Sequence, residues 1–163
     1  MIKKFLEEIV SKCNKCSTSK SIERWKYKSI YEFILDNGKE YNFTTDVEYI
    51  FSKPKECFMN AYNFINSNSD FDLIYVEGYA ISDKVNLPLY HAWAVDESGI
   101  VYDPTWRNGK EYYGVEFPMS YVSAILCEVG RIGVIDAWEC HYPLLSGLHK
   151  YPIDDNKEAV WTK

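Results

Sequence analysis

The chain has 163 residues, a length that suits one domain and buries roughly two thirds of its unfolded surface. Hydrophobic residues make up 47% and aromatic residues 17%, which excludes the polar, aromatic-poor composition of a disordered chain. The formal net charge of −6 predicts an acidic surface and argues against nucleic acid as a partner. We therefore expect one globular domain, residues 1–163, that needs neither a metal nor a disulfide to fold.

The first ten residues lack the pattern of a secretory signal. Glu7 and Glu8 fall where its apolar region would run, and no 18 consecutive apolar residues occur in the chain. We expect a cytoplasmic protein with no membrane partner. Its five cysteines are then expected to be reduced, so that at least one can serve as a working thiol.

The first quarter of the chain predicts helices. Residues 3–12 place apolar side chains on one face and charged ones on the other. A second helix is expected from Ser21, as its N-cap, to about Asp36, where Asn37 and Gly38 supply a stop. Residues 1–38 are interpreted as a helical flank.

A third helix is expected after an extended stretch at residues 41–45. The sequence Ser52-Lys53-Pro54 predicts its start, because proline is tolerated in the first turn of a helix. This helix carries Cys57 near its N-terminus and ends in the polar run 66–69.

From Phe71 the period of apolar residues changes to two. Residues 71–81, 87–95 and 99–102 are rich in β-branched or aromatic side chains, with a tight turn predicted at 97–99. Residues 112–117 add a strand and residues 120–129 a helix, on whose apolar face Cys127 is expected. The pattern predicts an α+β domain with a helix packed against an antiparallel sheet.

Three residues from one helix and two strands suit covalent chemistry on a carbonyl group. A helix start favours a thiolate at Cys57 through unpaired backbone N–H groups, which can also hold an oxyanion. His91 lies in one strand and Asp103 ends the next, so the hairpin brings them near cross-strand register. Cys57 is the candidate nucleophile, His91 the acid/base, and Asp103 the group that orients the imidazole and favours its charged form.

Four segments, residues 56–61, 75–80, 91–95 and 101–106, resemble in this order the core of the transglutaminase-like superfamily. They match its cysteine helix, a strand ending in Gly-Tyr, a His-Ala-Trp strand and a strand closing in Asp-Pro-Thr. The resemblance covers residues 54–106, about a third of the chain.

This resemblance implies a papain-like fold with residues 54–106 as the catalytic core and a Cys-His-Asp triad of Cys57, His91 and Asp103. The implied activity is acyl transfer from an amide or thioester carbonyl, as a hydrolase, protease, deamidase or transglutaminase-type transferase. The implied substrate is a protein, a peptide or a small amide. The family also contains inactive scaffolds, so a catalytically silent protein-binding module is the alternative.

Two features depart from the family pattern. Glu56 stands where a Trp or Gly often precedes the cysteine, and the chain contains no glutamine, which excludes a papain-like glutamine as oxyanion donor. Tyr41 and Tyr49 are candidates for a second donor. Two of the triad residues also have a purely structural interpretation. A lone Cys57 can be a small buried hydrophobic residue, and Asp103 before a proline can begin a turn.

Aromatic residues near the triad are candidate substrate-binding groups, although aromatic residues in strands belong more often to a core. These are Tyr90, Trp93, Trp106 and Tyr113. A Cys-x-x-Cys at Cys13 and Cys16 could form a zinc site with Cys140 and His141, but the arbitrary separation of the halves favours ordinary thiols. We expect no metal and no cofactor.

Overall fold

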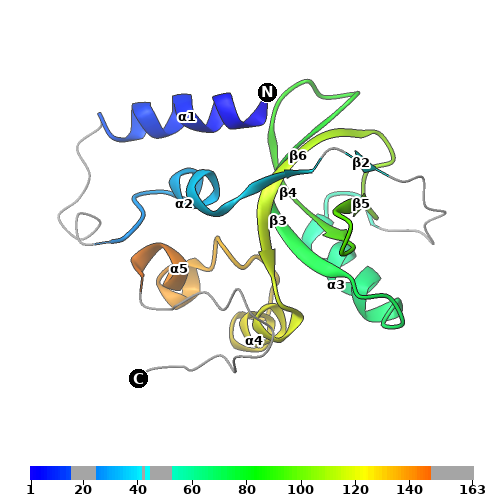
Figure 1. Ribbon diagram of the computed structural model, residues 1–163. Helices are drawn as coiled ribbons and strands as arrows, with labels where there is room; N and C mark the ends of the chain where they lie inside the picture. The colour runs from blue at the N-terminus through cyan, green and yellow to red at the C-terminus, as the bar shows by residue number, and fades with distance from the viewer. Residues whose placement is uncertain (16–24, 42, 45–52, 148–163) are drawn as a thin grey trace.

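The computed structural model describes residues 1–15, 25–41, 43–44 and 53–147 (Figure 1). The helices are α1 (Ile2–Cys13), α2 (Ile30–Asn37), α3 (Cys57–Ser67), α4 (Met119–Val129), the 3-10 helix η2 (Trp138–Cys140) and α5 (Pro143–Ser146). The strands are β1 (Lys39–Tyr41), β2 (Phe43–Thr44), β3 (Ile74–Ser82), β4 (Leu89–Val95), β5 (Ile100–Tyr102) and β6 (Gly109–Phe117). The predicted α+β class is confirmed.

The strands form one sheet in the order β1-β6-β3-β4-β5-β2. All neighbours are antiparallel except β2, which pairs parallel with β5. The long strands β3, β4 and β6 make up its centre, and both ends are short. The hairpin expected at 97–99 joins β4 to β5, with Gly99 in the left-handed region at φ 78°.

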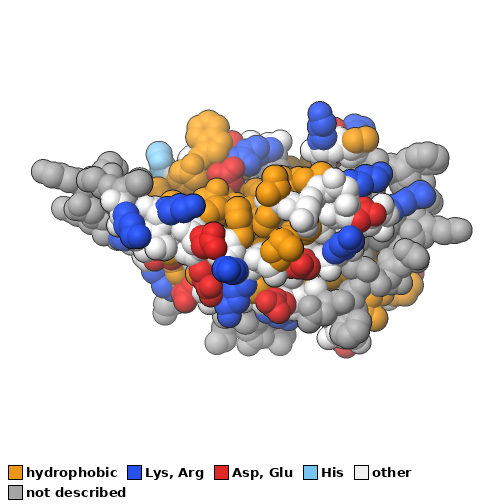
Figure 2. All heavy atoms as spheres, turned by 90° about the horizontal axis from the view of Figure 1, so that it is seen from above, with side chains coloured by type: hydrophobic (Ala, Val, Ile, Leu, Met, Phe, Trp, Pro, Cys, Tyr) orange, Lys and Arg blue, Asp and Glu red, His pale blue; other side chains and the backbone are white. Residues whose placement is uncertain are grey.

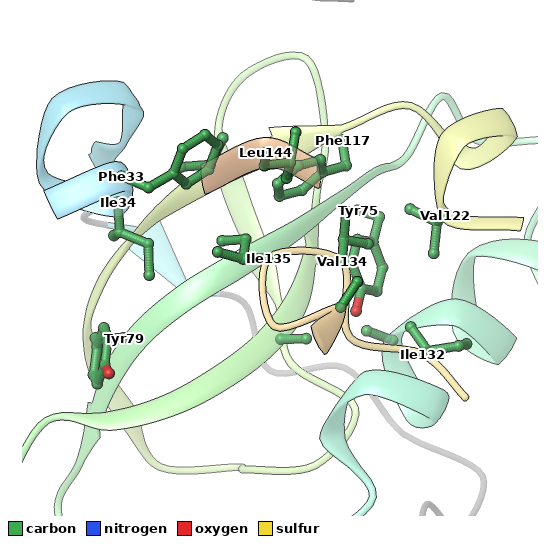
Figure 3. Packing of buried hydrophobic residues seen from close by; sticks show 14 of the residues in the cluster. Phe33, Ile34, Tyr75, Tyr79, Phe117, Val122, Ile132, Val134, Ile135 and Leu144 are labelled. Carbon is green, nitrogen blue, oxygen red and sulfur yellow. The ribbon is translucent and has the colours of Figure 1, made fainter. Parts of the chain in front are cut away.

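Each face of the sheet carries its own hydrophobic cluster because strand side chains alternate. One face bears Tyr75 and Tyr79 of β3 and is covered by residues of α1 to α5. Figure 3 shows this packing, with Phe33 and Ile34 of α2 and Val122 of α4 converging on it. The opposite face carries a smaller cluster: Tyr41, Val76, Ala80, Trp93, Val95, Val101 and Tyr112.

The surface also exposes some large apolar side chains. Figure 2, which views the molecule from above Figure 1, shows hydrophobic side chains exposed among basic and acidic ones. Val85, Leu87 and Leu89, between β3 and the start of β4, are exposed. Within the described ranges, no helix combines the length and the apolar character needed to cross a bilayer.

The second helix begins later than predicted. Residues 25–29 are not helical, and α2 starts at Ile30 with Ser29 as its N-cap. The Ser29 hydroxyl accepts the Glu32 N–H at 3.2 Å, and the Glu32 carboxylate accepts the Lys28 N–H at 2.5 Å. Ser29 and Glu32 thus have the spacing of a capping box, a stronger start signal than an isolated serine. The predicted cap, Ser21, lies outside the described residues.

Two further predictions need correction. Pro54 is not in the first turn of α3, because Lys55 has φ 68° in the left-handed region, which a right-handed helix cannot contain; α3 therefore begins at Cys57. Cys127 is exposed rather than buried on α4. It follows Ile125 by two residues, about 200° around the helix, so it points away from the core face.

Candidate active site

Cys57 is the first residue of α3 and is only 9% exposed. The N-cap, Glu56, makes no side-chain hydrogen bond to the first turn. A helix start without a side-chain cap leaves first-turn backbone N–H groups without an intrahelical partner. Those N–H groups and the thiol therefore lie together at the positive end of the helix dipole.

His91 lies in the middle of β4, where the sheet is open on one side. On the other side it pairs with Gly78 of β3, while the described β5 pairs only with Ala94 and Val95. The helix α3 packs against β4. A Cβ at Gly78 would collide with the backbone of Tyr113 and Gly114, so the close strands behind His91 require glycine here.

Asp103 accepts hydrogen bonds on both of its oxygens and is 3% exposed. Oδ1 accepts the backbone N–H groups of Thr105 and Trp106, each at 2.9 Å. Oδ2 lies 2.7 Å from His91 Nε2 and accepts the Tyr112 hydroxyl at 2.9 Å. The carboxylate of Asp103 therefore does two things at once: it closes the turn that the sequence predicted as one alternative, and it contacts His91, the partner that the sequence predicted as the other.

The electrostatics favour a charged His91. Burial by itself opposes the charged ring, but the charge and hydrogen bond of Asp103 outweigh it. The nearby Cys57 acts in the same direction, and the pKa of His91 rises from 6.5 to about 9. The surroundings of the ring therefore favour its imidazolium form.

A cleft of about 770 Å³ opens onto the thiol and the imidazole. Of the predicted substrate-binding aromatics, Tyr90 and Trp106 line it. The Trp106 ring is stacked on His91, with centroids 3.9 Å apart and planes 15° apart. The structure does not bring Trp93 or Tyr113 to the cleft. Trp93 is buried beneath His91 in the smaller core, and the Tyr113 hydroxyl donates to the Leu35 carbonyl of α2.

Two positioning residues escaped the sequence analysis. The Tyr112 hydroxyl donates to Asp103. The only signal in the sequence was the alternation of side chains along β6, which indicates the face of the sheet on which Tyr112 lies. Asn60 is buried one turn after Cys57, and its amide donates to the Lys53 carbonyl at 2.8 Å and to Thr105 Oγ1 at 3.0 Å. It thus connects the segment before α3 to the turn that holds Asp103. The spacing from Cys57 to Asn60, three residues on one helix face, was the available signal.

The other predicted groups lie elsewhere. The Tyr41 hydroxyl donates to Glu116 at 3.2 Å, while Tyr49 and Cys16 lie outside the described residues. Cys13 ends α1, and Cys140 and His141 lie in and just after η2. Within the described part of the chain, no group of three or more His, Cys, Asp or Glu side chains is arranged to hold a metal ion.

Comparison with protein-family models, curated proteins and solved structures gives no match to the chain. The class of protein is therefore inferred from the fold and the site: an α+β domain in which a thiol at a helix start shares a cleft with a buried His–Asp pair.

Proposed function

We propose that the chain is a cysteine-dependent acyl-transfer enzyme of the transglutaminase-like, papain-related type. The observation that carries this proposal is the buried pair of His91 and Asp103, 2.7 Å apart, which shares a cleft with the Cys57 thiol at the start of α3. A structural cysteine does not require a charged histidine, and a histidine held only for packing does not require a carboxylate with four donors.

The mechanism follows from these groups. The Cys57 thiolate attacks the carbonyl carbon of an amide or thioester, forming an S–C bond while the carbonyl electron pair moves onto oxygen. Backbone N–H groups at the start of α3 stabilise this oxyanion. His91 Nε2 is engaged by Asp103, so Nδ1 is the nitrogen that delivers a proton to the leaving group as the original bond breaks.

The resulting thioester is resolved by a second nucleophile. Neutral His91 removes a proton from water or an amine, which attacks the acyl carbon and releases the Cys57 thiolate. Hydrolysis is the simpler outcome for a domain of this size, and transfer to an amine is the variant. Trp106, stacked over the imidazole, limits the rotation of the ring during both proton transfers.

The test is selective alkylation of the thiols at neutral pH with limiting iodoacetamide, read by peptide mapping. We expect Cys57 to react first although it is buried, and the exposed Cys127 to serve as the internal reference. His91→Ala should remove this preference without changing labelling at Cys127. Treatment with EDTA should leave the reactivity unchanged, since the groups named above supply nucleophile, proton donor and oxyanion stabiliser.

Turnover provides the second readout. Once an amide substrate is found, His91→Ala should lower kcat by about 10²-fold or more, and Asp103→Asn by less, because Asp103 acts through the histidine. Circular dichroism checks that both variants fold. Dominant labelling of Cys127 or Cys13 in the wild-type protein would contradict the proposal and favour a silent protein-binding module.

A further inference from the structure

The rim of the catalytic cleft has a charge opposite to that of the molecule. Among the described residues that line it, Lys55, Lys84 and Arg107 are basic and only Asp83 is an exposed acid. The whole chain has 24 acidic and 18 basic residues. On this composition, an average patch of the surface would carry more acidic than basic side chains. The rim of the cleft carries more basic than acidic ones.

The three basic groups come from three separate segments. Lys55 precedes α3, Lys84 follows β3, and Arg107 follows the turn that holds Asp103. None of them takes part in an ion pair with a described carboxylate. No described carboxylate neutralises their charges, and the low-dielectric walls of the cleft concentrate the field of these charges.

The backbone at Lys55 provides an independent observation. Its φ of 68° is a conformation that glycine adopts freely and that other residues adopt at a cost. The strained residue lies two positions before the candidate nucleophile and lines the cleft. Non-glycine residues in such conformations cluster at active sites and ligand clamps.

Apolar side chains line the cleft beside these charges. Phe58 and Tyr90 pack against each other with ring centroids 5.3 Å apart, and Val85 and Leu89 complete this wall. A volume of about 770 Å³ is large enough for a ligand well beyond a single amide group. An extended peptide with both apolar and acidic side chains matches this lining.

We propose that the acyl donor is an acidic peptide segment, in which aspartate or glutamate side chains flank the reacting amide and pair with Lys84, Arg107 and Lys55. This inference rests on the proposed acyl-transfer function and specifies its substrate class. Opposite charges bring such a segment to the cleft, and the same field repels basic peptides.

The first experiment measures the field at the thiol without requiring turnover. Iodoacetate and iodoacetamide both alkylate a thiolate, with formation of an S–C bond and loss of iodide, but only iodoacetate is an anion. The ratio of their rates at Cys57, relative to the ratio at Cys127, reports the local potential. His91 also attracts the anion, so the decisive comparison is between variants that retain it.

We expect the double variant Lys84→Gln/Arg107→Gln to lower the iodoacetate to iodoacetamide ratio at Cys57 by about fourfold at low salt, because one unit charge acting across a cleft in water changes such a ratio by roughly twofold. The loss should shrink at high ionic strength. The control Lys12→Gln/Lys15→Gln removes the same charge from the end of α1 and should leave the ratio unchanged.

The second experiment uses two capped pentapeptides with a central glutamine, flanked by glutamates in one and by lysines in the other. The acidic peptide should protect Cys57 from iodoacetamide in the wild type, and less well in the Lys84→Gln/Arg107→Gln variant. Equal protection by both peptides, or an unchanged iodoacetate ratio in the variant, would overturn the inference while Cys57 remained the fastest thiol. If Cys57 is not selectively alkylated at all, the acyl-transfer proposal itself fails.

Discussion

Single side chains in the site each make several contacts. Asp103 closes a turn with Oδ1 and holds His91 with Oδ2, so its orientation is set by the backbone before it meets the imidazole. Tyr112 adds a third kind of donor to the same carboxylate. A side chain with this many partners has little rotational freedom, which keeps the His–Asp pair aligned in the free protein.

The raised pKa of His91 predicts a pH-dependent stability. The ring binds its proton more tightly in the folded state, with a pKa of about 9, than at the ordinary value of 6.5. The stabilisation is therefore complete below pH 6.5 and is lost as the pH rises through 9. The difference of 9 − 6.5 = 2.5 corresponds to about 3 kcal/mol.

Urea unfolding between pH 6 and pH 10 measures this loss. His91→Asn, which cannot become charged, should remove the part of the pH dependence that falls between 6.5 and 9. Parallel decreases in the wild type and the variant would assign the pH dependence to other groups.

At the scale of elements, α3 and the β5–β6 connection are held together by Asn60. Its amide spans from the Lys53 carbonyl to Thr105, so the segment before Cys57 and the turn of Asp103 share one donor group. Cys57 begins α3, and Asp103, which holds His91, lies in the β5–β6 connection, so the relative position of the two elements helps to place the thiol with respect to the His–Asp pair.

Asn60→Ala is expected to lower the free energy of unfolding by about 1–3 kcal/mol, because the substitution removes both hydrogen bonds of a buried amide. It should also slow alkylation of Cys57. Asn63→Ala is the matched control, since Asn63 is exposed on the same helix and should change stability by less than about 0.5 kcal/mol. Equal effects of the two substitutions, measured by urea unfolding and peptide mapping, would show that Asn60 has no special positioning role.

At the scale of the whole molecule, Glu77 joins the sheet to the segment after α4. This fully buried carboxylate accepts the Tyr75 and Tyr90 hydroxyls at 2.9 and 2.8 Å and the backbone N–H groups of Val134 and Ile135 at 2.6 and 3.0 Å. Burial raises its pKa above the ordinary value, and these hydrogen bonds offset only part of that rise. All four partners donate, so they match the carboxylate form. Through Tyr90 this network reaches the cleft.

Glu77→Gln should therefore reduce the free energy of unfolding by about 3 kcal/mol, because an amide NH₂ would face groups that also donate. The control is Glu40→Gln, an exposed position on β1 that should be close to neutral. Thermal unfolding compares the two. A neutral Glu77→Gln would mean that the segment 132–135 is held by its apolar contacts alone.

The local pattern of the sequence was sufficient for the class of fold and for the pairing of His91 with Asp103. Period-two alternation predicted the central strands, and the turn at 97–99 placed His91 and Asp103 near each other, because hairpin register is a local property. The last pair of β4 and β5 is Ala94 with Tyr102. Continued by one residue, this register places Asp103 opposite Trp93, and His91 is the diagonal neighbour of Asp103 on the same face. The partnership with Cys57 stays a prediction of function.

Tertiary structure decided what local pattern could not. Whether an aromatic side chain lines the cleft or the core depends on which elements cover its face, so Trp106 reached the cleft while Trp93 and Tyr113 did not. The roles of Asn60, Tyr112 and Glu77 depend on partners 45, 9 and 57 residues away. Hydrogen bonds across such distances leave no periodicity in the sequence, because they are set by the packing of whole elements against the sheet.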